Sequence, residues 1–219
     1  MLVFDTELLL RALPVLLGGM IVTLELGVLA IALSLAWGLI VVLGRVSSVR
    51  AVSLTAAVYI QVVRNTPVLV QMYFLYFGLA MHGVRLPGFA AGLIALVLQN
   101  GGYIAEIYRA GIASVSRAQR EAGLALGLRP ALTFRLVILP QAIRAVMPPL
   151  GNQFLVIMKD TALASALSVA DMTFEARLLI DRTAAAYEIF LILALLYLAL
   201  NSALAGLMRA AEWHLRPPV

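Results

Sequence analysis

Long apolar segments separated by short polar stretches dominate the sequence. A helix needs about 20 apolar residues to cross the hydrocarbon core of a membrane, so the chain has room for about five crossings. We therefore predict an all-α integral membrane protein with about five transmembrane helices in a single domain, residues 1–219. The predicted spans are approximately 13–43, 51–81, 89–107, 136–158 and 184–208.

Polar residues interrupt the second predicted span at Arg64-Asn65-Thr66-Pro67. Proline removes a backbone donor and biases the residue before it away from the helical conformation. Within a membrane such a break is tolerated only where it is buried in protein or lines a cavity, and transporters place substrates at broken helices. A simple proline kink, with Arg64 reaching toward the membrane surface, is the alternative.

Further polar side chains lie in the third and fourth spans, where they need partners from other helices, water or a ligand. A broken helix offers unpaired backbone groups that can bind a charged or polar solute. The predicted substrate-binding residues are Asn65, Thr66, Gln99, Gln153 and Asp160. Gating or structural roles are predicted for Arg64, Pro67, Glu106 and Lys159. Asp160 could instead form only a local salt bridge with Lys159.

Composition strengthens the membrane assignment, because 63% of the residues are hydrophobic and only 12% are charged. The sequence has no cysteine, and its two histidines, His82 and His214, lie far apart, so we expect no metal site. We assign the net charge of +5 to cytoplasmic loops rather than to nucleic-acid binding. The first residues carry Asp5 and Glu7 where a signal peptide would be basic, so we expect the first span to be retained. The polar segment 161–172 is too short to cross alone, and we expect it to be re-entrant or at the surface.

The distribution of basic residues predicts the orientation, because cytoplasmic loops are enriched in arginine and lysine. One set of loops carries Arg45, Arg50, Arg109, Arg117, Arg120, Arg129, Arg135, Arg209 and Arg216, with only Glu121 and Glu212 as acids. The opposite set carries Arg11, Arg85, Lys159, Arg177 and Arg182 together with Asp5, Glu7, Asp160, Asp171, Glu175 and Asp181. We therefore predict the first set to be cytoplasmic, with the N-terminus outside and the C-terminus inside.

The stretch 121–140 is the longest region of the chain in which polar residues are mixed with apolar ones. Glu121 and Ala122 belong to a predicted short helix that ends at Gly127, because glycine adopts the left-handed conformation that ends many helices. Pro130 suits the first turn of the next helix. From these features alone, the stretch could also be an amphipathic loop helix with basic anchors.

The same stretch resembles the EAA loop of bacterial ATP-binding-cassette importer permeases. Its pattern is Glu-Ala-Ala, three residues, Gly, nine residues, Ile, one residue and Leu-Pro, and Glu121, Ala122, Gly127, Leu139 and Pro140 occupy its positions. Gly123 replaces the second alanine and Val137 the isoleucine. The resemblance implies a cytoplasmic coupling helix at about 115–127 that docks into the ATPase subunit. The implied coupling residues are Arg120, Glu121, Ala122, Gly123, Leu126 and Gly127.

Three other segments, 62–78, 103–123 and 139–165, are similar to polar amino-acid importer permeases of the histidine, glutamate, glutamine and arginine type. Asn65 stands where that group commonly has glycine, and Thr161-Ala162-Leu163 stands in place of Thr-Ser-Leu. The resemblance implies a type I importer permease fold in the bacterial inner membrane, working by alternating access. The implied partners are a second permease chain, identical or paralogous, two cytoplasmic ATPases, an extracytoplasmic binding protein, membrane lipid and a polar amino acid. ATP and magnesium are expected on the ATPase, with no cofactor and no catalytic residue in this chain.

Other classes of membrane protein remain as alternatives. An ion-coupled secondary transporter could use Glu25, Arg64, Glu106 and Asp160 as a relay, although the chain has no evident inverted repeat. An intramembrane serine hydrolase would need a paired histidine, and neither histidine lies in a membrane-core position. A simple membrane anchor would need neither broken helices nor buried amides. Copurification of an ATPase would separate an importer permease from these alternatives.

Overall fold

The computed structural model describes residues 6–214 and contains helices but no strand within that range. Asp5 and Arg216, which enter the predicted orientation, lie outside the described residues. The helices are α1 (Thr6–Arg45), α2 (Arg50–Arg64), α3 (Val68–Tyr73), the π-helix η1 (Phe74–Gly78), α4 (Gly88–Ala113), α5 (Arg117–Ala125), α6 (Pro130–Thr133), the π-helix η2 (Phe134–Ile138), α7 (Leu139–Asp160), the 3₁₀ helix η3 (Thr161–Leu167), α8 (Met172–Thr183) and α9 (Ala186–His214).

The long apolar helices agree with four of the five predicted spans. Within the described residues, four helical stretches are long and apolar enough to cross a membrane, namely 10–45, 88–113, 130–167 and 186–214. The second predicted span, 51–81, is not one long helix. Its helix α2 ends at Arg64, and after Pro67 the chain forms only the shorter apolar stretch Val68–Gly78. The Arg64–Pro67 interruption therefore separates two short helices, because Pro67 cannot donate the hydrogen bond that would continue α2.

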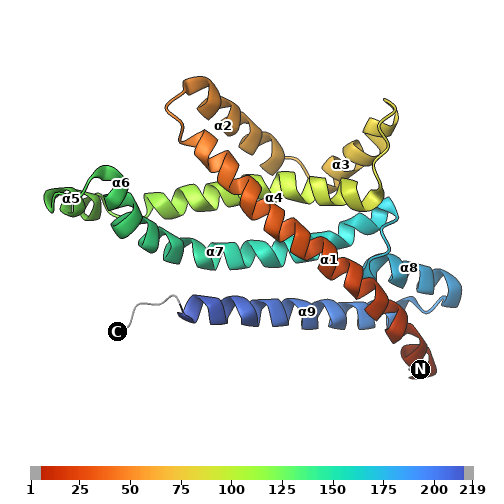
Figure 1. Ribbon diagram of the computed structural model, residues 1–219. Coiled ribbons are helices and arrows are strands. Elements are labelled where there is room, and N and C mark those ends of the chain that lie inside the picture. The colour runs from red at the N-terminus through yellow and green to blue at the C-terminus, as the bar shows by residue number, and fades with distance from the viewer. Residues whose placement is uncertain (1–5, 215–219) are drawn as a thin grey trace.

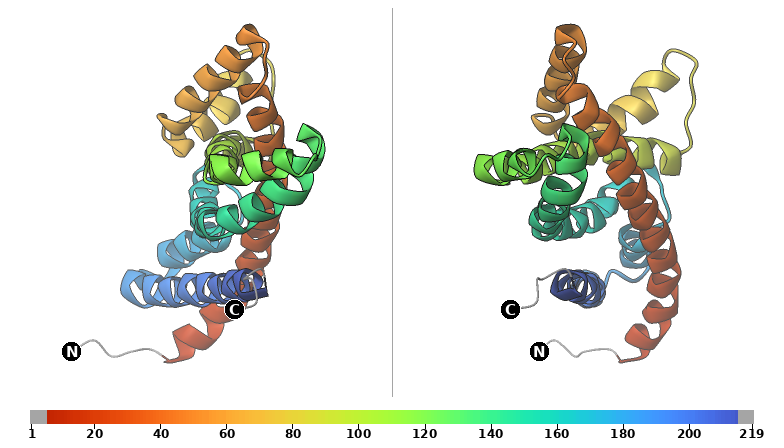
Figure 2. Two further views of the ribbon diagram at one scale, coloured as in Figure 1. Left: turned by 90° about the vertical axis from the view of Figure 1, so that its left-hand side faces the viewer. Right: turned by 60° about the vertical axis from the view of Figure 1, so that its left-hand side comes forward.

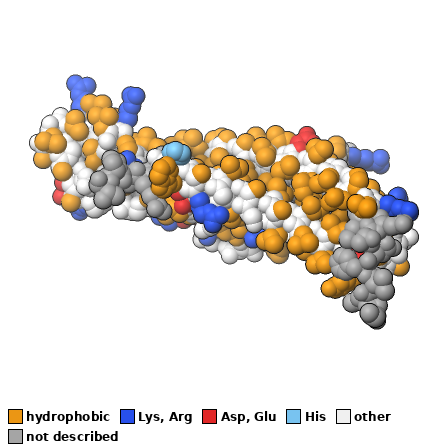
Figure 3. Space-filling view, turned by 90° about the horizontal axis from the view of Figure 1, so that it is seen from below, with side chains coloured by type: hydrophobic (Ala, Val, Ile, Leu, Met, Phe, Trp, Pro, Cys, Tyr) orange, Lys and Arg blue, Asp and Glu red, His pale blue; other side chains and the backbone are white. Residues whose placement is uncertain are grey.

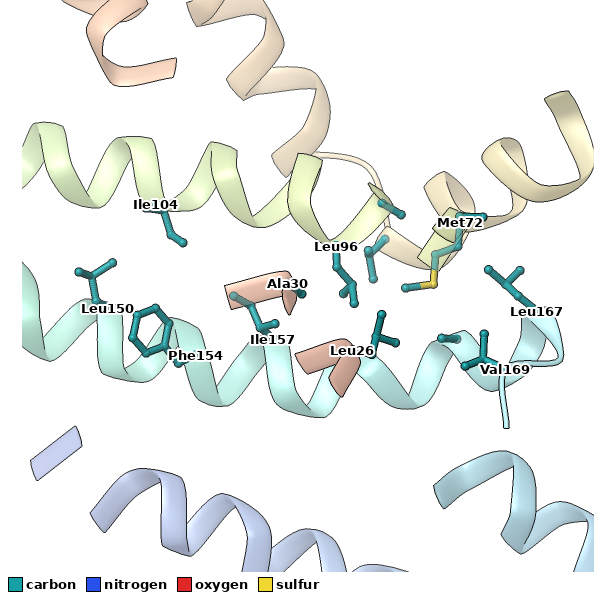
Figure 4. Packing of buried hydrophobic residues seen from close by; sticks show 14 of the residues in the cluster. Leu26, Ala30, Met72, Leu96, Ile104, Leu150, Phe154, Ile157, Leu167 and Val169 are labelled. Atoms are coloured by element: carbon teal, nitrogen blue, oxygen red, sulfur yellow. The ribbon is translucent and has the colours of Figure 1, made fainter. Parts of the chain in front are cut away.

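The hydrophobic core lies where α1, α4 and α7 meet (Figure 1). In Figure 4, side chains of these helices point toward one another, and Met72 of α3 joins them from the side. The labelled core residues are Leu26, Ala30, Met72, Leu96, Ile104, Leu150, Phe154, Ile157, Leu167 and Val169. This packing fixes α4 against α7, the two helices that carry most of the polar side chains considered below.

Helix α1 runs obliquely across the other long helices, and the views in Figures 1 and 2 agree on this arrangement. The short helices α5 and α6 project at one end of the molecule, the side toward which α9 also ends, while α8 and the start of α1 lie at the opposite end. Figure 3 shows hydrophobic side chains over much of one long face, with Lys and Arg side chains standing out at both ends. Such an extended apolar surface suits a membrane-spanning protein.

The segment 161–172, predicted to be re-entrant or at the surface, is mostly buried, which overturns the surface alternative and leaves the re-entrant one a prediction. Its first part is η3, which continues directly from α7 and buries Thr161, Ala164 and Ser165. Helix α4 makes this possible, because Gly92 lets η3 approach closely and a Cβ atom there would stand 3.3 Å from the Cβ of Ala164. The expectation of a surface segment was therefore wrong, since the small residues of 161–172 permit close helix packing rather than exposure.

Candidate functional site

Helix α5 is short because specific residues define both of its ends. The Ser116 side chain caps the first turn by accepting a hydrogen bond from the Gln119 amide. At the other end the Leu128 amide donates to the Gly123 carbonyl at 3.2 Å, and the Gly127 amide donates to the Leu124 carbonyl at 2.9 Å. These two bonds form a Schellman motif, with Gly127 at φ +79°. The predicted ending of this helix at Gly127 is confirmed.

The exposed surface of α5 carries both charged and apolar side chains. Arg117 donates to the Glu121 carboxylate at 2.8 Å, one turn away along the exposed face. Leu126 leaves 82% of its surface exposed. Among the six residues assigned to ATPase coupling, only Gly123 is buried, whereas Arg120, Glu121, Ala122, Leu126 and Gly127 are exposed. An exposed leucine and an exposed ion pair, both at a short helix that projects from the end of the molecule, make a surface suited to a protein partner.

Gly123 faces the opposite direction and packs against α6. A Cβ atom at position 123 would lie 2.7 Å from the Thr133 methyl carbon, closer than side chains approach. Thr133 itself is buried, and its hydroxyl donates to the Arg129 carbonyl at 3.3 Å. The departure from Glu-Ala-Ala therefore has a local physical reason, because Thr133 fills the space that an alanine side chain would occupy.

Two glutamine side chains bind the backbone at the break between α2 and α3. The side-chain amide of Gln99 donates to the Thr66 carbonyl at 2.7 Å and to the Val63 carbonyl at 3.3 Å. The side-chain amide of Gln71 donates to the Thr66 carbonyl at 3.3 Å and to the Val63 carbonyl at 3.0 Å. It also donates to the Thr66 hydroxyl at 2.8 Å. The break is therefore held by side-chain donors from α3 and α4, which satisfy carbonyls that a continuous helix would have satisfied itself.

The structure groups only some of the predicted substrate-binding residues. Thr66 and Gln99 are in direct contact, and Asn65 adjoins them, with its amide bonded to the Gln61 carbonyl at 2.8 Å. Gln153 on α7 instead donates to the Asn100 side chain at 2.7 Å. Asp160 lies two turns farther along α7, about 10 Å from Gln153 by helical rise.

Lys159 and Asp160 form no ion pair in the structure. The ion pairs between residues 12 and 214 join Arg109 to Glu106 and Arg117 to Glu121. The Lys159 side chain is exposed, whereas Asp160 is half-buried at the end of α7. The gating role of Lys159 therefore stays a prediction, without a contact to Asp160 to support it.

A charged groove of about 480 Å³ runs along α4 and α7. Arg64, Glu106 and Arg109 supply its charged groups, and Gln153 lies on its wall. Arg109 binds Glu106 through three hydrogen bonds of 2.7 to 3.2 Å. The Arg64 guanidinium carbon lies 4.9 Å from the centre of the Tyr103 ring, whose hydroxyl donates to the Arg64 carbonyl at 3.2 Å. Arg64 is therefore held in place by Tyr103 rather than by a carboxylate.

Asp171 is a buried acid at the far end of the molecule from α5. It precedes α8, and its Oδ1 atom accepts a hydrogen bond from the Phe174 amide at 2.8 Å. Its Oδ2 atom is buried and has no hydrogen-bonding partner among the described residues. Burial raises the pKa of this carboxyl from the ordinary 3.8 to about 7. Asp171 lies outside the four apolar stretches that are long enough to cross a membrane.

Sequence reasoning assigned no role to Gln71 or Tyr103, and it noted Asn100 only as a polar amide that needs a partner. Gln71 was counted as part of the apolar span 51–81. A side-chain amide this close to a proline break could have been recognised as a donor for the backbone carbonyls that the break leaves unbonded. Asn100 adjoins the predicted Gln99 but contacts α7 instead, since adjacent residues on a helix point in different directions. Nothing in the sequence around Tyr103 indicates its contact with Arg64, because the two residues are 39 positions apart.

Comparison with known proteins decides the family. Residues 30–216 match the family described as "Binding-protein-dependent transport system inner membrane component". This chain belongs to that family. It is 37% identical over 215 residues to the glutamine transport system permease protein GlnP of Escherichia coli (strain K12), covering 97% of this chain and 98% of that protein. It is 36% identical over 224 residues to the nopaline transport system permease protein NocM of Agrobacterium fabrum (strain C58), covering 97% and 92%.

Solved structures agree with this family assignment. A chain in the crystal structure of an amino acid ABC transporter with histidines is 37% identical to this chain, superposes with a TM-score of 0.92, and covers 98% of this chain and 100% of its own length. A chain of the MetNI methionine ABC transporter shares the fold at 15% identity and a TM-score of 0.69, covering 97% of this chain. The predicted all-α permease fold is confirmed. The family membership favours an ABC transporter permease over the alternative of an ion-coupled secondary transporter, and it makes the chain an inner-membrane component.

Proposed function

We propose that this chain is the membrane-spanning permease of an ATP-driven importer of amino acids. Relatives named for glutamine and nopaline transport support this substrate class, as does a closely similar chain crystallised with histidines. The permease gives the amino acid a path that opens alternately to each side of the membrane. Its energy comes from ATP and magnesium bound by a separate ATPase subunit rather than by this chain.

The observation that carries the proposal is the geometry of α5. This helix projects from the end of the molecule, and it presents exposed Leu126 and the Arg117–Glu121 ion pair. Two ordered helix ends and the packing of Gly123 on Thr133 make it a rigid projection. A rigid helix can transmit movement of a docked ATPase into α6 and α7, which follow it in the chain. Arg120, Glu121, Ala122, Leu126 and Gly127 form the docking surface, with Gly123 fixing the helix from behind.

The substrate path follows the polar groups on the inner helices. Asn65, Thr66 and Gln99 form its central part at the helix break, and Gln153 continues it along α7. Asp160 contributes a negative charge toward the end of the molecule opposite α5, where a binding protein delivers the amino acid. Pro67 fixes the break, while Arg64, Glu106 and Lys159 act as gating or structural residues beside the path.

The working assembly contains two permease chains, identical or paralogous, two cytoplasmic ATPases and an extracytoplasmic binding protein. The orientation that suits this assembly has the N-terminus outside and α5 with the C-terminus in the cytoplasm. It is supported by the many arginines near α5 and by α9, which ends toward the same side of the molecule as α5 in Figure 1. Closure of the ATPases on ATP then moves α5 and reverses the side to which the path is open.

Docking is tested by copurification and ATPase assays on the assembled transporter. Glu121→Lys breaks the ion pair with Arg117 and reverses the charge of the docking surface, and Gly127→Leu strains a position at φ +79°. We expect both variants to insert normally but to lose most substrate-stimulated ATP hydrolysis. Ser48→Lys, in the exposed turn between α1 and α2, is a matched control and should behave like the wild type. Normal stimulated hydrolysis in both α5 variants would contradict the proposed docking surface.

A further inference from the structure

The charged groove along α4 and α7 contains a guanidinium group, that of Arg64, that has no hydrogen-bonding or ion-pairing partner among the described residues. Arg64 is exposed, and among the described residues its five N–H donors make no hydrogen bond to a side chain or carbonyl. Tyr103 nevertheless holds it by ring contact, with 4.9 Å between the guanidinium carbon and the ring centre. A positioned arginine with free donors presents the planar fork that binds carboxylates bidentately.

A carboxylate lies beside this free guanidinium. Glu106 lines the same groove, and both of its oxygens accept hydrogen bonds from Arg109. Each carboxylate oxygen can accept a further bond, so Glu106 can still bind an ammonium group. Arg64 and Glu106 also line, together with Arg45, a smaller groove of about 210 Å³. The large groove is therefore lined by both a positive group and a negative group.

The groove extends from the predicted substrate path toward α5. Gln153 lies near one end and Ser114, just after the end of α4, near the other. From Tyr103 to Ser114 the helix rises about 16 Å. The volume of about 480 Å³ falls in the range of small-molecule pockets and is ample for one amino acid.

We propose that Arg64 and Glu106 form a second amino-acid position on the α5 side of the helix break, where Arg64 binds the α-carboxylate and Glu106 binds the α-ammonium group. Arg109 is a positioning residue that orients Glu106. The site recognises the zwitterionic end common to all free α-amino acids and leaves the side chain to the rest of the groove. This inference rests on the proposed transport of amino acids.

The absence of cysteine from the sequence allows a single-cysteine protection experiment. Ala110→Cys places a thiol on the exposed wall of the groove. The transporter, assembled with its ATPase in nanodiscs without binding protein, is labelled with a charged thiol reagent. L-glutamine, its methyl ester and N-acetyl-L-glutamine are titrated as protecting ligands. Because the recognised groups are common to all amino acids, glutamine serves as probe even if another amino acid is the preferred substrate.

We expect glutamine to slow the labelling, and each derivative to need a concentration at least about tenfold higher, as expected when a charge-assisted hydrogen bond is lost. In the Arg64→Gln background the methyl ester should protect at the same concentration as glutamine, so that its concentration penalty disappears. The N-acetyl derivative should still need the higher concentration. In the Glu106→Gln background the reverse should hold. Arg64→Lys should retain part of the penalty for the ester. Arg50→Gln, an exposed arginine outside both grooves, should leave both penalties unchanged.

Equal protection by glutamine and both derivatives would overturn the second position, as would penalties that persist in both variants. Coelution of each variant with the ATPase reports its folding. If the transporter accumulates an amino acid in vesicles but no amino acid protects Ala110→Cys, the second position fails and the importer function stands. If it neither transports nor binds any amino acid, the proposed function itself fails.

Discussion

Gly123 controls how closely α5 packs on α6, because the Thr133 methyl group occupies the space beside it. Gly123→Ala restores the usual alanine of the loop pattern but forces a contact of 2.7 Å. We expect the substitution to destabilise this packing by about 1–3 kcal/mol and to reduce ATPase coupling. Thermal unfolding and stimulated ATP hydrolysis of the assembled transporter measure both effects.

The double variant Gly123→Ala/Thr133→Ser provides the matched test. Serine removes the obstructing methyl group and keeps the hydroxyl that donates to the Arg129 carbonyl. We expect the double variant to recover most of the stability and coupling. Equal losses in the single and double variants would show that the Thr133 methyl group is not the cause.

Asp171 makes stability depend on pH. Its folded-state pKa of about 7 lies above the ordinary 3.8, so between about pH 4 and 7 the folded protein retains a proton that the unfolded chain releases. Its contribution therefore falls as pH rises through this window, by on the order of 1 kcal/mol per pH unit, and is constant above it. Melting temperatures of wild type and Asp171→Asn across that range test this.

Asparagine keeps the cap of α8 without a titratable group, so the variant should lose the Asp171 contribution to the pH dependence. An identical pH slope in both proteins would assign the dependence to other groups.

At the scale of the elements, the break between α2 and α3 is stabilised by two glutamine side chains that donate to the same two backbone carbonyls. Gln71 and Gln99 both bond to the Val63 and Thr66 carbonyls, so either can partly replace the other. We expect Gln71→Leu and Gln99→Leu each to destabilise the protein modestly, and the double variant to lose more than the sum. An unsatisfied buried carbonyl costs about 1–3 kcal/mol. Gln119→Leu on exposed α5 is the control, and strictly additive losses would contradict shared bonding.

The elements also show how far sequence patterns reach. The apolar runs predicted four long helices well, because the length of a membrane helix is set by the bilayer. Pro67 predicted the break but not the two short helices around it. The contacts Gln153–Asn100 and Arg64–Tyr103 could not be predicted, because they join distant residues through helix packing. The end of α5 was predictable, since Gly127 acts locally.

For the whole molecule, the proposed orientation rests on the arginines near α5 and stays a prediction. His82 lies in the turn before α4 and Ser48 in the turn between α1 and α2, and both are exposed. In right-side-out vesicles we expect an impermeant thiol reagent to label His82→Cys and not Ser48→Cys, with the opposite result in inverted vesicles. The sequence has no other cysteine to label. The reverse pattern would contradict the predicted orientation.

Transport in proteoliposomes containing the permease, its ATPase and its binding protein tests the central claim most directly. The account predicts that vesicles supplied with ATP and magnesium accumulate an amino acid, and that Glu121→Lys abolishes this accumulation while the complex stays assembled. It also predicts no accumulation from an imposed proton or sodium gradient without ATP. Uptake that is driven by such a gradient, and that is indifferent to ATP, would contradict the account.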